Sequence, residues 1–170
     1  NDDQEVATGE AGEICVRSGH VMAEYWKRPD ITAETLKSGW LHTGDIARKD
    51  ERGYMFILDR KKDMIVSGGF NIFPREIEDV LSQHADVAMV AVVGVPDEKW
   101  GEAVTAVVVA REGARPDAEE LIALVKARKG SAHAPKEIRF VTELPMTGVG
   151  KVDKKVLKAG FWAGRDRMVG

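Results

Sequence analysis

Two valine-rich stretches, VAMVAVVGV at residues 87–95 and AVTAVVVA at residues 103–110, decide the fold of the second half of this chain. Each stretch is short and almost wholly apolar, a pattern typical of strands that are buried on both faces. The turn signal Pro96-Asp97-Glu98 separates them. We therefore predict two neighbouring buried strands joined by a turn at residues 96–98.

Helices are predicted on either side of this strand pair. Pro74 fits the first turn of one helix, and a second helix opens after Pro116, where Asp117 and Glu120 have the spacing of a capping box. Their apolar positions recur at helical spacing and predict two buried faces: Ile77, Val80 and Leu81 in one, and Leu121, Leu124 and Val125 in the other. A strand at residues 138–141 and a helix at residues 153–159 complete this half.

The first half of the chain predicts a small β-rich region. Residues 9–17 form a turn followed by an alternating strand, and residues 44–58 contain two β-prone runs around a polar turn, which predicts a hairpin. A short helix is expected at residues 30–36, with Asp30 as its N-cap. The alternating elements after residue 63 predict a compact α+β or α/β sandwich, so the chain as a whole is predicted to have an α+β fold.

A run of five charged residues, Asp59-Arg60-Lys61-Lys62-Asp63, lies between two apolar strands. Composition alone favours a solvated turn. The run is also the best candidate for a domain boundary, because few contacts need to cross such a segment. We expect a β-rich unit at residues 1–60, a hinge at residues 61–62 and a second domain at residues 63–170.

The composition is that of a globular protein, with 44% hydrophobic and 31% charged residues. A net charge of −3 gives no reason to expect a nucleic-acid partner, and no apolar run is long enough for a transmembrane segment. The single cysteine, Cys15, favours a reducing compartment and is expected to be a buried small apolar residue rather than a reactive thiol. The four histidines lack the spacing of metal ligands, so no metal site is predicted.

Three segments carry residue types suited to ligand chemistry. Asp45, which follows Thr43-Gly44 at a strand end, could accept hydrogen bonds from a ribose diol or could cap a turn. Lys151 follows Gly148-Val149-Gly150 and could meet a phosphate or carboxylate oxygen, although the spacing is not that of a Walker loop. The glycine-rich loop Ser67–Asn71 could lie against a slender ligand or be a plain hairpin turn.

The order and spacing of these segments resemble motifs of the adenylate-forming enzymes, a family of acyl-CoA synthetases, peptide-synthetase adenylation domains and luciferases. WLHTGD at residues 40–45 resembles the motif Trp-x-x-Thr-Gly-Asp. Residues 53–78 look like the motif that follows it in the family, and PMTGVGK at residues 145–151 matches Pro-x-Thr-x-x-Gly-Lys. Near residue 133, where many relatives carry Tyr-Lys-x-Pro, this sequence has AHAP at residues 132–135.

The resemblance implies roles for particular residues. In the family, ATP activates a carboxylic acid as an acyl-adenylate, coenzyme A then takes the acyl group, and a small C-terminal domain swings on a hinge between the two steps. Asp45 should bind the ribose hydroxyls, Arg60 the ribose or phosphate, and Lys62 should occupy the hinge position. Lys151 should stabilise the charge that builds during adenylation. After the swing, five residues should approach the pantetheine tunnel: Ser67, Gly68, Gly69, Phe70 and Asn71.

The implied substrates and cofactors are ATP with its product AMP, coenzyme A and a carboxylic acid, with Mg²⁺ held by ligands outside this sequence. The acidic start without a Met and the absence of the family's ATP-phosphate loop imply a C-terminal part of an acyl-CoA synthetase. Such a part should be inactive alone and should depend on an N-terminal domain of the same protein. A cytoplasmic location is expected, with peripheral membrane attachment and oligomer formation left open.

The expected acid is a medium- or long-chain fatty acid, and an aryl or alicyclic acid is the alternative, because the acyl pocket is not in this sequence. Two other functions remain open from the residues. One is a stand-alone, non-catalytic lid or binding module. The other is an adenylation domain that feeds a carrier protein.

Overall fold

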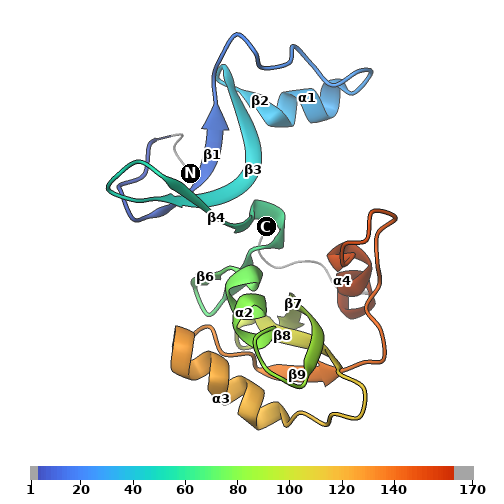
Figure 1. Cartoon of the computed structure of the whole chain (residues 1–170). Coiled ribbons are helices and arrows are strands. Elements are labelled where there is room, and N and C mark those ends of the chain that lie inside the picture. Colours follow the sequence, from blue (N-terminus) through green and yellow to red (C-terminus); the bar gives the residue numbers. More distant parts are fainter. Residues whose placement is uncertain (1–3, 163–170) are drawn as a thin grey trace. The chain divides into compact units, whose positions relative to one another are not determined.

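The computed structural model describes residues 4–162, which form two compact units. The first unit extends to Lys62 and the second begins at Asp63. Each unit has its own sheet, and the expected α+β fold is confirmed (Figure 1). The ends of the two expected domains, residues 1–3 and 163–170, lie outside the described residues. Within residues 4–162, no helix combines the length and apolar character that a membrane span requires.

The first unit is an antiparallel sheet organised around one long strand. That strand, β3 (Trp40–Lys49), pairs with β1 (Ala11–Val16), with the short β2 (Leu36–Lys37) and with β4 (Met55–Arg60). The turn between β3 and β4 closes on Asp50, whose carboxylate accepts hydrogen bonds from the backbone N–H groups of the following turn. The hairpin predicted at residues 44–58 is therefore confirmed.

The helix of the first unit begins earlier than predicted. α1 spans Pro29–Thr35, so Asp30 lies within its first turn and is not the N-cap. The Asp30 carboxylate instead pairs with the guanidinium of Arg28 at 2.8 Å. Proline explains the shift, because it lacks an N–H and its fixed φ suits the first helical position.

Over residues 63–162, the second unit is a five-stranded sheet with three helices. Its sheet has the order β6-β5-β8-β7, and β9 pairs with β8 in parallel. The strands are β5 (Ile65–Ser67), β6 (Phe70–Ile72), β7 (Val87–Asp97), β8 (Gly101–Ala110) and β9 (Glu137–Phe140), and the helices are α2 (Pro74–Leu81), α3 (Ala118–Lys129) and α4 (Lys154–Trp162).

Both faces of the β7–β8 pair carry buried clusters, which explains why the two runs are apolar except for the buried Thr105. Val104, Ala106 and Val108 of β8 belong to one buried cluster, together with residues of α2 and α3. Val107 faces the opposite way and packs in a second cluster with Leu157 of α4. The prediction of two buried neighbouring strands is confirmed for most of their length, because side chains on both sides of the pair meet apolar partners, and only Ala88 and Met89 of β7 are exposed.

The predicted helix faces are also confirmed. Four of the six predicted inner residues of α2 and α3 are almost fully buried, at 0% exposure, and Leu124 packs against them. α3 begins after Asp117, whose carboxylate accepts a hydrogen bond from the N–H of Glu120 at 2.9 Å. This is the N-cap contact that the sequence predicts.

The turn between β7 and β8 lies further along the chain than predicted. β7 continues through Pro96 and Asp97, and the turn occupies residues 98–100. Asp97 controls it, because its Oδ1 accepts hydrogen bonds from the N–H groups of Lys99 and Trp100, each at 2.9 Å. Pro96 is tolerated in the strand, where β7 forms an edge of the sheet.

One carboxylate is buried inside the second unit. Glu102 of β8 is 1% exposed, and its Oε2 accepts a hydrogen bond from the N–H of Val66 in β5 at 2.8 Å. A Cβ placed on Gly94 of β7 would lie 2.9 Å from the Glu102 Oε1. The carboxylate therefore connects β8 to β5 by a hydrogen bond, and it occupies the space where a side chain at position 94 would lie.

Candidate functional site

The segment Thr43-Gly44-Asp45 lies where β3 departs from regular pairing with β1. Glu13 lies opposite Ile46 and Cys15 opposite His42, so β3 advances four positions (46 − 42) while β1 advances two (15 − 13). Gly44 has a φ of +73° at this irregularity, a conformation that favours glycine. The glycine is therefore required by the backbone of the bulge.

Hydrogen bonds from β1 fix this bulge in place. The hydroxyl of Thr43 donates to the carbonyl of Ile14 at 2.8 Å and accepts from the N–H of Asp45 at 3.1 Å. The N–H of Gly44 donates to Oε1 of Glu13 at 3.0 Å. The position of Asp45 thus depends on its own strand and on two residues of β1.

Asp45 and Arg60, both predicted to bind nucleotide, lie directly opposite each other on β3 and β4. The Arg60 Nε lies 3.1 Å from the Asp45 Oδ1, and the Asp45 side chain is 30% exposed. A carboxylate that accepts hydrogen bonds and a guanidinium that donates them therefore stand together at one accessible place. This combination suits a ligand that offers hydroxyl groups beside a negative charge, as a nucleoside phosphate does.

The two lysines after Arg60 form a single 3-10 turn with Asp63, over Lys61–Asp63. The ammonium of Lys61 contacts Oε2 of Glu13 at 2.9 Å. Lys62 is exposed and is the last residue of the first unit. The predicted hinge residue therefore stands at the division between the units.

Glu13 belongs to the candidate site by its contacts, and the sequence did not predict it. Its carboxylate binds the N–H of Gly44 through Oε1, and His42 and Lys61 through Oε2. Burial by itself would raise the pKa of Glu13, but the hydrogen bonds from Lys61, His42 and Gly44 together lower it. The available signal was its position two residues before Cys15, which places both side chains on one face of the strand.

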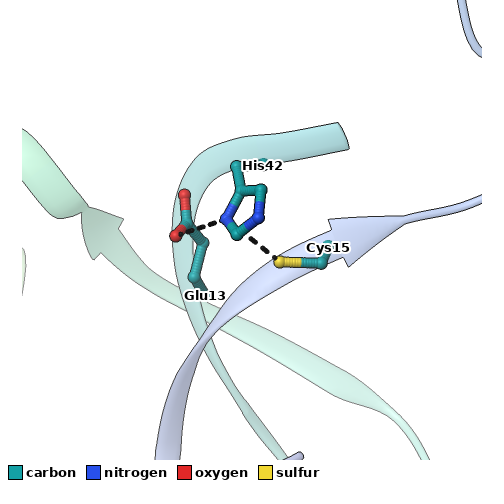
Figure 2. Close-up of side chains that lie close together, drawn as sticks. All are labelled: Glu13, Cys15 and His42. Carbon is teal, nitrogen blue, oxygen red and sulfur yellow. Dashed lines mark hydrogen bonds and ion pairs between the residues drawn. The ribbon is translucent and has the colours of Figure 1, made fainter. Parts of the chain in front are cut away.

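The same face of the sheet brings three different ligand-type side chains together (Figure 2). Cys15 is half-buried, and its Sγ lies 3.5 Å from His42 Nδ1, which also lies 3.2 Å from Glu13 Oε2. The spacing argument that predicted no metal site did not consider this group, because His42 is 27 residues from Cys15 in the chain but opposite it in the sheet. Spacing along the sequence does not detect ligands that meet across two strands.

In the second unit, the glycine-rich loop is a tight turn between β5 and β6. Ser67 and Phe70 are paired residues of the two strands, and Gly68 and Gly69 form the turn with φ values of +56° and +83°. Ser67 is buried, whereas Phe70 is 59% exposed. A Cβ on Gly68 would lie 2.7 Å from the ring of Trp100, so both conformation and space require glycine there.

Two ammonium groups lie over the ring that supports this turn. The Nζ atoms of Lys99 and Lys136 are each 4.9 Å from the centroid of Trp100, and the carbonyl of Trp100 accepts a hydrogen bond from Gly68 N–H at 2.9 Å. Cations at this distance are attracted to the face of an indole ring. The turn is consequently accompanied by two positive charges from different segments of the second unit.

Lys151 closes a second defined loop of the same unit. The loop begins and ends with a bridge between Met146 and Val152, and Thr147 N–H donates to the carbonyl of Lys151 at 2.7 Å. The Thr147 hydroxyl oxygen also accepts a hydrogen bond from the Lys151 N–H at 3.2 Å. The backbone of Lys151 is therefore held in a tight loop, while the residue itself is exposed. Asp45 and Arg60 belong to the first unit and Lys151 to the second.

Comparison with known proteins shows which proteins this chain resembles in sequence and in fold. Residues 76–151 match the family of AMP-binding enzyme C-terminal domains. The chain is 56% identical to the medium/long-chain-fatty-acid–CoA ligase FadD8 of Mycobacterium tuberculosis, over 97% of this chain and 30% of the ligase. It is 47% identical to a feruloyl-CoA synthase of Amycolatopsis sp, over 92% of this chain and 32% of the synthase.

A solved structure shows the same fold. The amide bond synthetase McbA from Marinactinospora thermotolerans matches with a TM-score of 0.84 and 44% identity, over 93% of this chain and 32% of McbA. This chain thus spans about a third of the length of the relatives that it matches. The chain thus contains an AMP-binding enzyme C-terminal domain at residues 76–151, and over more than nine-tenths of its length it is similar to these relatives.

Proposed function

We propose that this chain is part of an ATP-dependent acyl-CoA synthetase that converts a carboxylic acid into an acyl-adenylate and then into an acyl-CoA thioester. The observation that carries the proposal is the Asp45–Arg60 pair, which offers an acceptor and a cation side by side. The similarity to a fatty-acid–CoA ligase and to a feruloyl-CoA synthase supports the reaction type.

In the first step, a carboxylate oxygen of the acid attacks the α-phosphorus of ATP. The bond from that phosphorus to the bridging oxygen breaks, and pyrophosphate leaves with the electron pair. Asp45 accepts hydrogen bonds from the ribose hydroxyls, and Arg60 donates to the ribose or the phosphate. Lys151 holds an oxygen on which negative charge increases, which lowers the barrier electrostatically.

In the second step, the thiol sulfur of coenzyme A attacks the acyl carbon, and the bond from that carbon to the AMP oxygen breaks. The thiol gives up its proton, and AMP leaves as an anion. We place the turn at Gly68 and Gly69 beside the pantetheine arm, because it has no side chains that would obstruct a slender ligand. Lys99 and Lys136 provide positive charge near this turn for the phosphates of coenzyme A.

The change from the first step to the second requires a different part of the second unit to reach the reacting atoms. Lys62 is the proposed hinge, since it is exposed and lies where the first unit ends. A few residues at the end of an element can absorb the backbone rotation of such a domain movement.

Magnesium accompanies ATP in this chemistry, and its fit can be tested against the residues present. Among residues 4–162, the one group of three clustered His, Cys, Asp or Glu side chains is Glu13, Cys15 and His42. Mg²⁺ prefers oxygen ligands in octahedral geometry, which this group does not supply. This group of residues therefore does not fit a magnesium site.

The experiment that tests the proposal is acid-dependent exchange of pyrophosphate into ATP. It would be run on this chain and on the longer enzyme that we propose contains it, with fatty, aryl and alicyclic acids. We expect exchange only in the longer enzyme and with a medium- or long-chain fatty acid preferred. If none of the acids supports exchange in the longer enzyme, adenylation is refuted. If exchange occurs but no thioester forms with coenzyme A, a carrier protein is favoured as the acyl acceptor.

A further inference from the structure

We propose that Glu13, Cys15 and His42 form a binding site for a thiophilic divalent metal ion such as Zn²⁺, in the sheet of the first unit. The site is separate from the nucleotide-binding pair, although one of its ligands also holds the bulge next to Asp45. The ligand set is one thiolate, one imidazole and one carboxylate, all of which Zn²⁺ accepts.

The convergence of both contacts on one nitrogen distinguishes this arrangement from a catalytic relay. The Sγ of Cys15 and the Oε2 of Glu13 both approach His42 Nδ1, at 3.5 and 3.2 Å (Figure 2). In a thiol–imidazole–carboxylate relay, the thiol and the carboxylate contact different ring nitrogens. Three ligand atoms grouped around one point instead leave a position between them that a single ion can occupy.

The distances match the edges of a metal-centred tetrahedron. Typical Zn–N, Zn–S and Zn–O bonds with tetrahedral angles give an N to S separation of about 3.6 Å and an N to O separation of about 3.3 Å. The observed separations are 3.5 and 3.2 Å, and the three ligand atoms all lie within 4.8 Å of one another. The third edge, from Cys15 Sγ to the Glu13 oxygen, is about 3.6 Å in such a tetrahedron and at most 4.8 Å here, so entry of an ion requires these two atoms to approach each other by no more than about 1.2 Å.

The sheet holds these ligands in register. Cys15 and His42 are directly opposite each other on β1 and β3, and Glu13 lies two residues before Cys15 on the same strand. The side chains of Glu13 and His42 are only 14% and 17% exposed. Three protein ligands leave a fourth position for water or another ligand, as in open zinc sites.

The carboxylate of Glu13 can bind a metal ion and hold the β-bulge at the same time, because its two oxygens have different partners. Its Oε1 accepts the N–H of Gly44, whereas its Oε2 is the oxygen that faces His42. The competitor for Oε2 is the ammonium of Lys61, at 2.9 Å. Lys61 has a side chain that is 62% exposed, so its ammonium can turn into water when a metal ion takes its place. The proposal therefore predicts that Lys61 weakens metal binding.

The experiment is a titration of this chain, reduced and free of chelator, with Co²⁺ alone and then with Zn²⁺. We expect a thiolate-to-cobalt charge-transfer band at one equivalent, which Zn²⁺ abolishes by displacement. Cys15→Ser should remove the band, and His42→Gln should weaken binding at least about tenfold. Lys61→Gln should strengthen binding about fivefold, because a competing positive charge is removed. His20→Gln, at an exposed histidine of the same unit, is the matched control and should change nothing.

A second measurement applies if a variant does not fold, as judged by circular dichroism. Cys15 is the single cysteine, so its alkylation by iodoacetamide reports on the site in the unaltered chain. Zn²⁺ should slow this alkylation at least about tenfold. The proposal is overturned if the folded chain gives neither the band nor the protection. It is also overturned if His42→Gln binds as tightly as the unaltered chain, or if Lys61→Gln binds more weakly.

Discussion

Replacement of Gly94 by alanine should destabilise the second unit through the buried Glu102. The added methyl group would lie 2.9 Å from both Cδ and Oε1 of Glu102, closer than such carbons approach other atoms. Glu102 is 1% exposed, and its Oε2 is held at 2.8 Å by the N–H of Val66, so the carboxylate has little freedom to move. Overpacking of this kind costs about 1–3 kcal/mol.

The pair of residues allows a sharper test through a double-mutant cycle. Glu102→Ala alone removes the acceptor of a buried N–H and leaves a cavity, for which we expect a loss of about 3 kcal/mol. In that background Gly94→Ala should cost about 1–2 kcal/mol less than it does alone, because the atoms that it would meet are gone. The two changes should therefore be less damaging together than the sum of their separate effects.

Hydrogen exchange in peptides from β7 and β8, measured at increasing urea concentrations, reports the unfolding free energy of the second unit without a contribution from the first. Gly160→Ala is the matched control, since a Cβ there meets nothing within 4 Å and the residue lies in α4. That change should leave stability unchanged or raise it slightly. Additive effects of Gly94→Ala and Glu102→Ala, or an equal loss from Gly160→Ala, would refute the steric reasoning.

Three further outcomes are expected. Lys151→Ala in the longer enzyme should reduce acid-dependent ATP–pyrophosphate exchange about 100-fold or more. It should largely spare thioester formation from a supplied acyl-adenylate, and equal losses in both assays would contradict the role proposed for Lys151. Lys62→Pro should impair thioester formation more than adenylation, and an unchanged second step would exclude it as the hinge. Glu13 has a lowered pKa, so its contribution to stability is complete above its ordinary value near 4.5 and is lost as the pH falls through the lowered value. Glu13→Gln should therefore flatten the acid limb of a stability-versus-pH curve below about pH 5, and a curve parallel to that of the unaltered chain would show that other carboxylates control it.

The elements that the sequence predicted well are those whose signals are local. Pro74 and Asp117 act within one helical turn, and both helices begin where these residues indicate. The apolar runs of β7 and β8 needed no knowledge of their partners, because burial on both faces produces an unbroken run. Asp30 was misassigned because two starting signals, proline and a capping residue, were adjacent, and the proline determined the first turn.

The candidate site was predictable only in part, and the reason is again the distance over which the signals act. Asp45 and Arg60 are 15 positions apart in the chain, and the structure brings them together because the hairpin predicted at residues 44–58 continues through residues 59 and 60, where composition favoured a turn. Glu13 and His42 meet across β1 and β3, and a long connection that contains α1 separates these strands. No turn signal specifies the register of that pairing. The sequence therefore could not predict the hydrogen bonds that Glu13 accepts or its cluster with His42 and Cys15.

The contacts of Glu13 also suggest where a backbone rotation can begin. Arg60 and Lys61 are consecutive residues, and their cationic groups bind two different carboxylates, Asp45 and Glu13. A rotation about ψ of Arg60, or about φ of Lys61, would carry the ammonium of Lys61 away from Glu13 and break that ion pair. The next residue, Lys62, is exposed and is the last residue of that unit. Rotation at Lys62 would leave both pairs intact, so the proposed nucleotide-binding pair would keep its geometry while the chain beyond it turns.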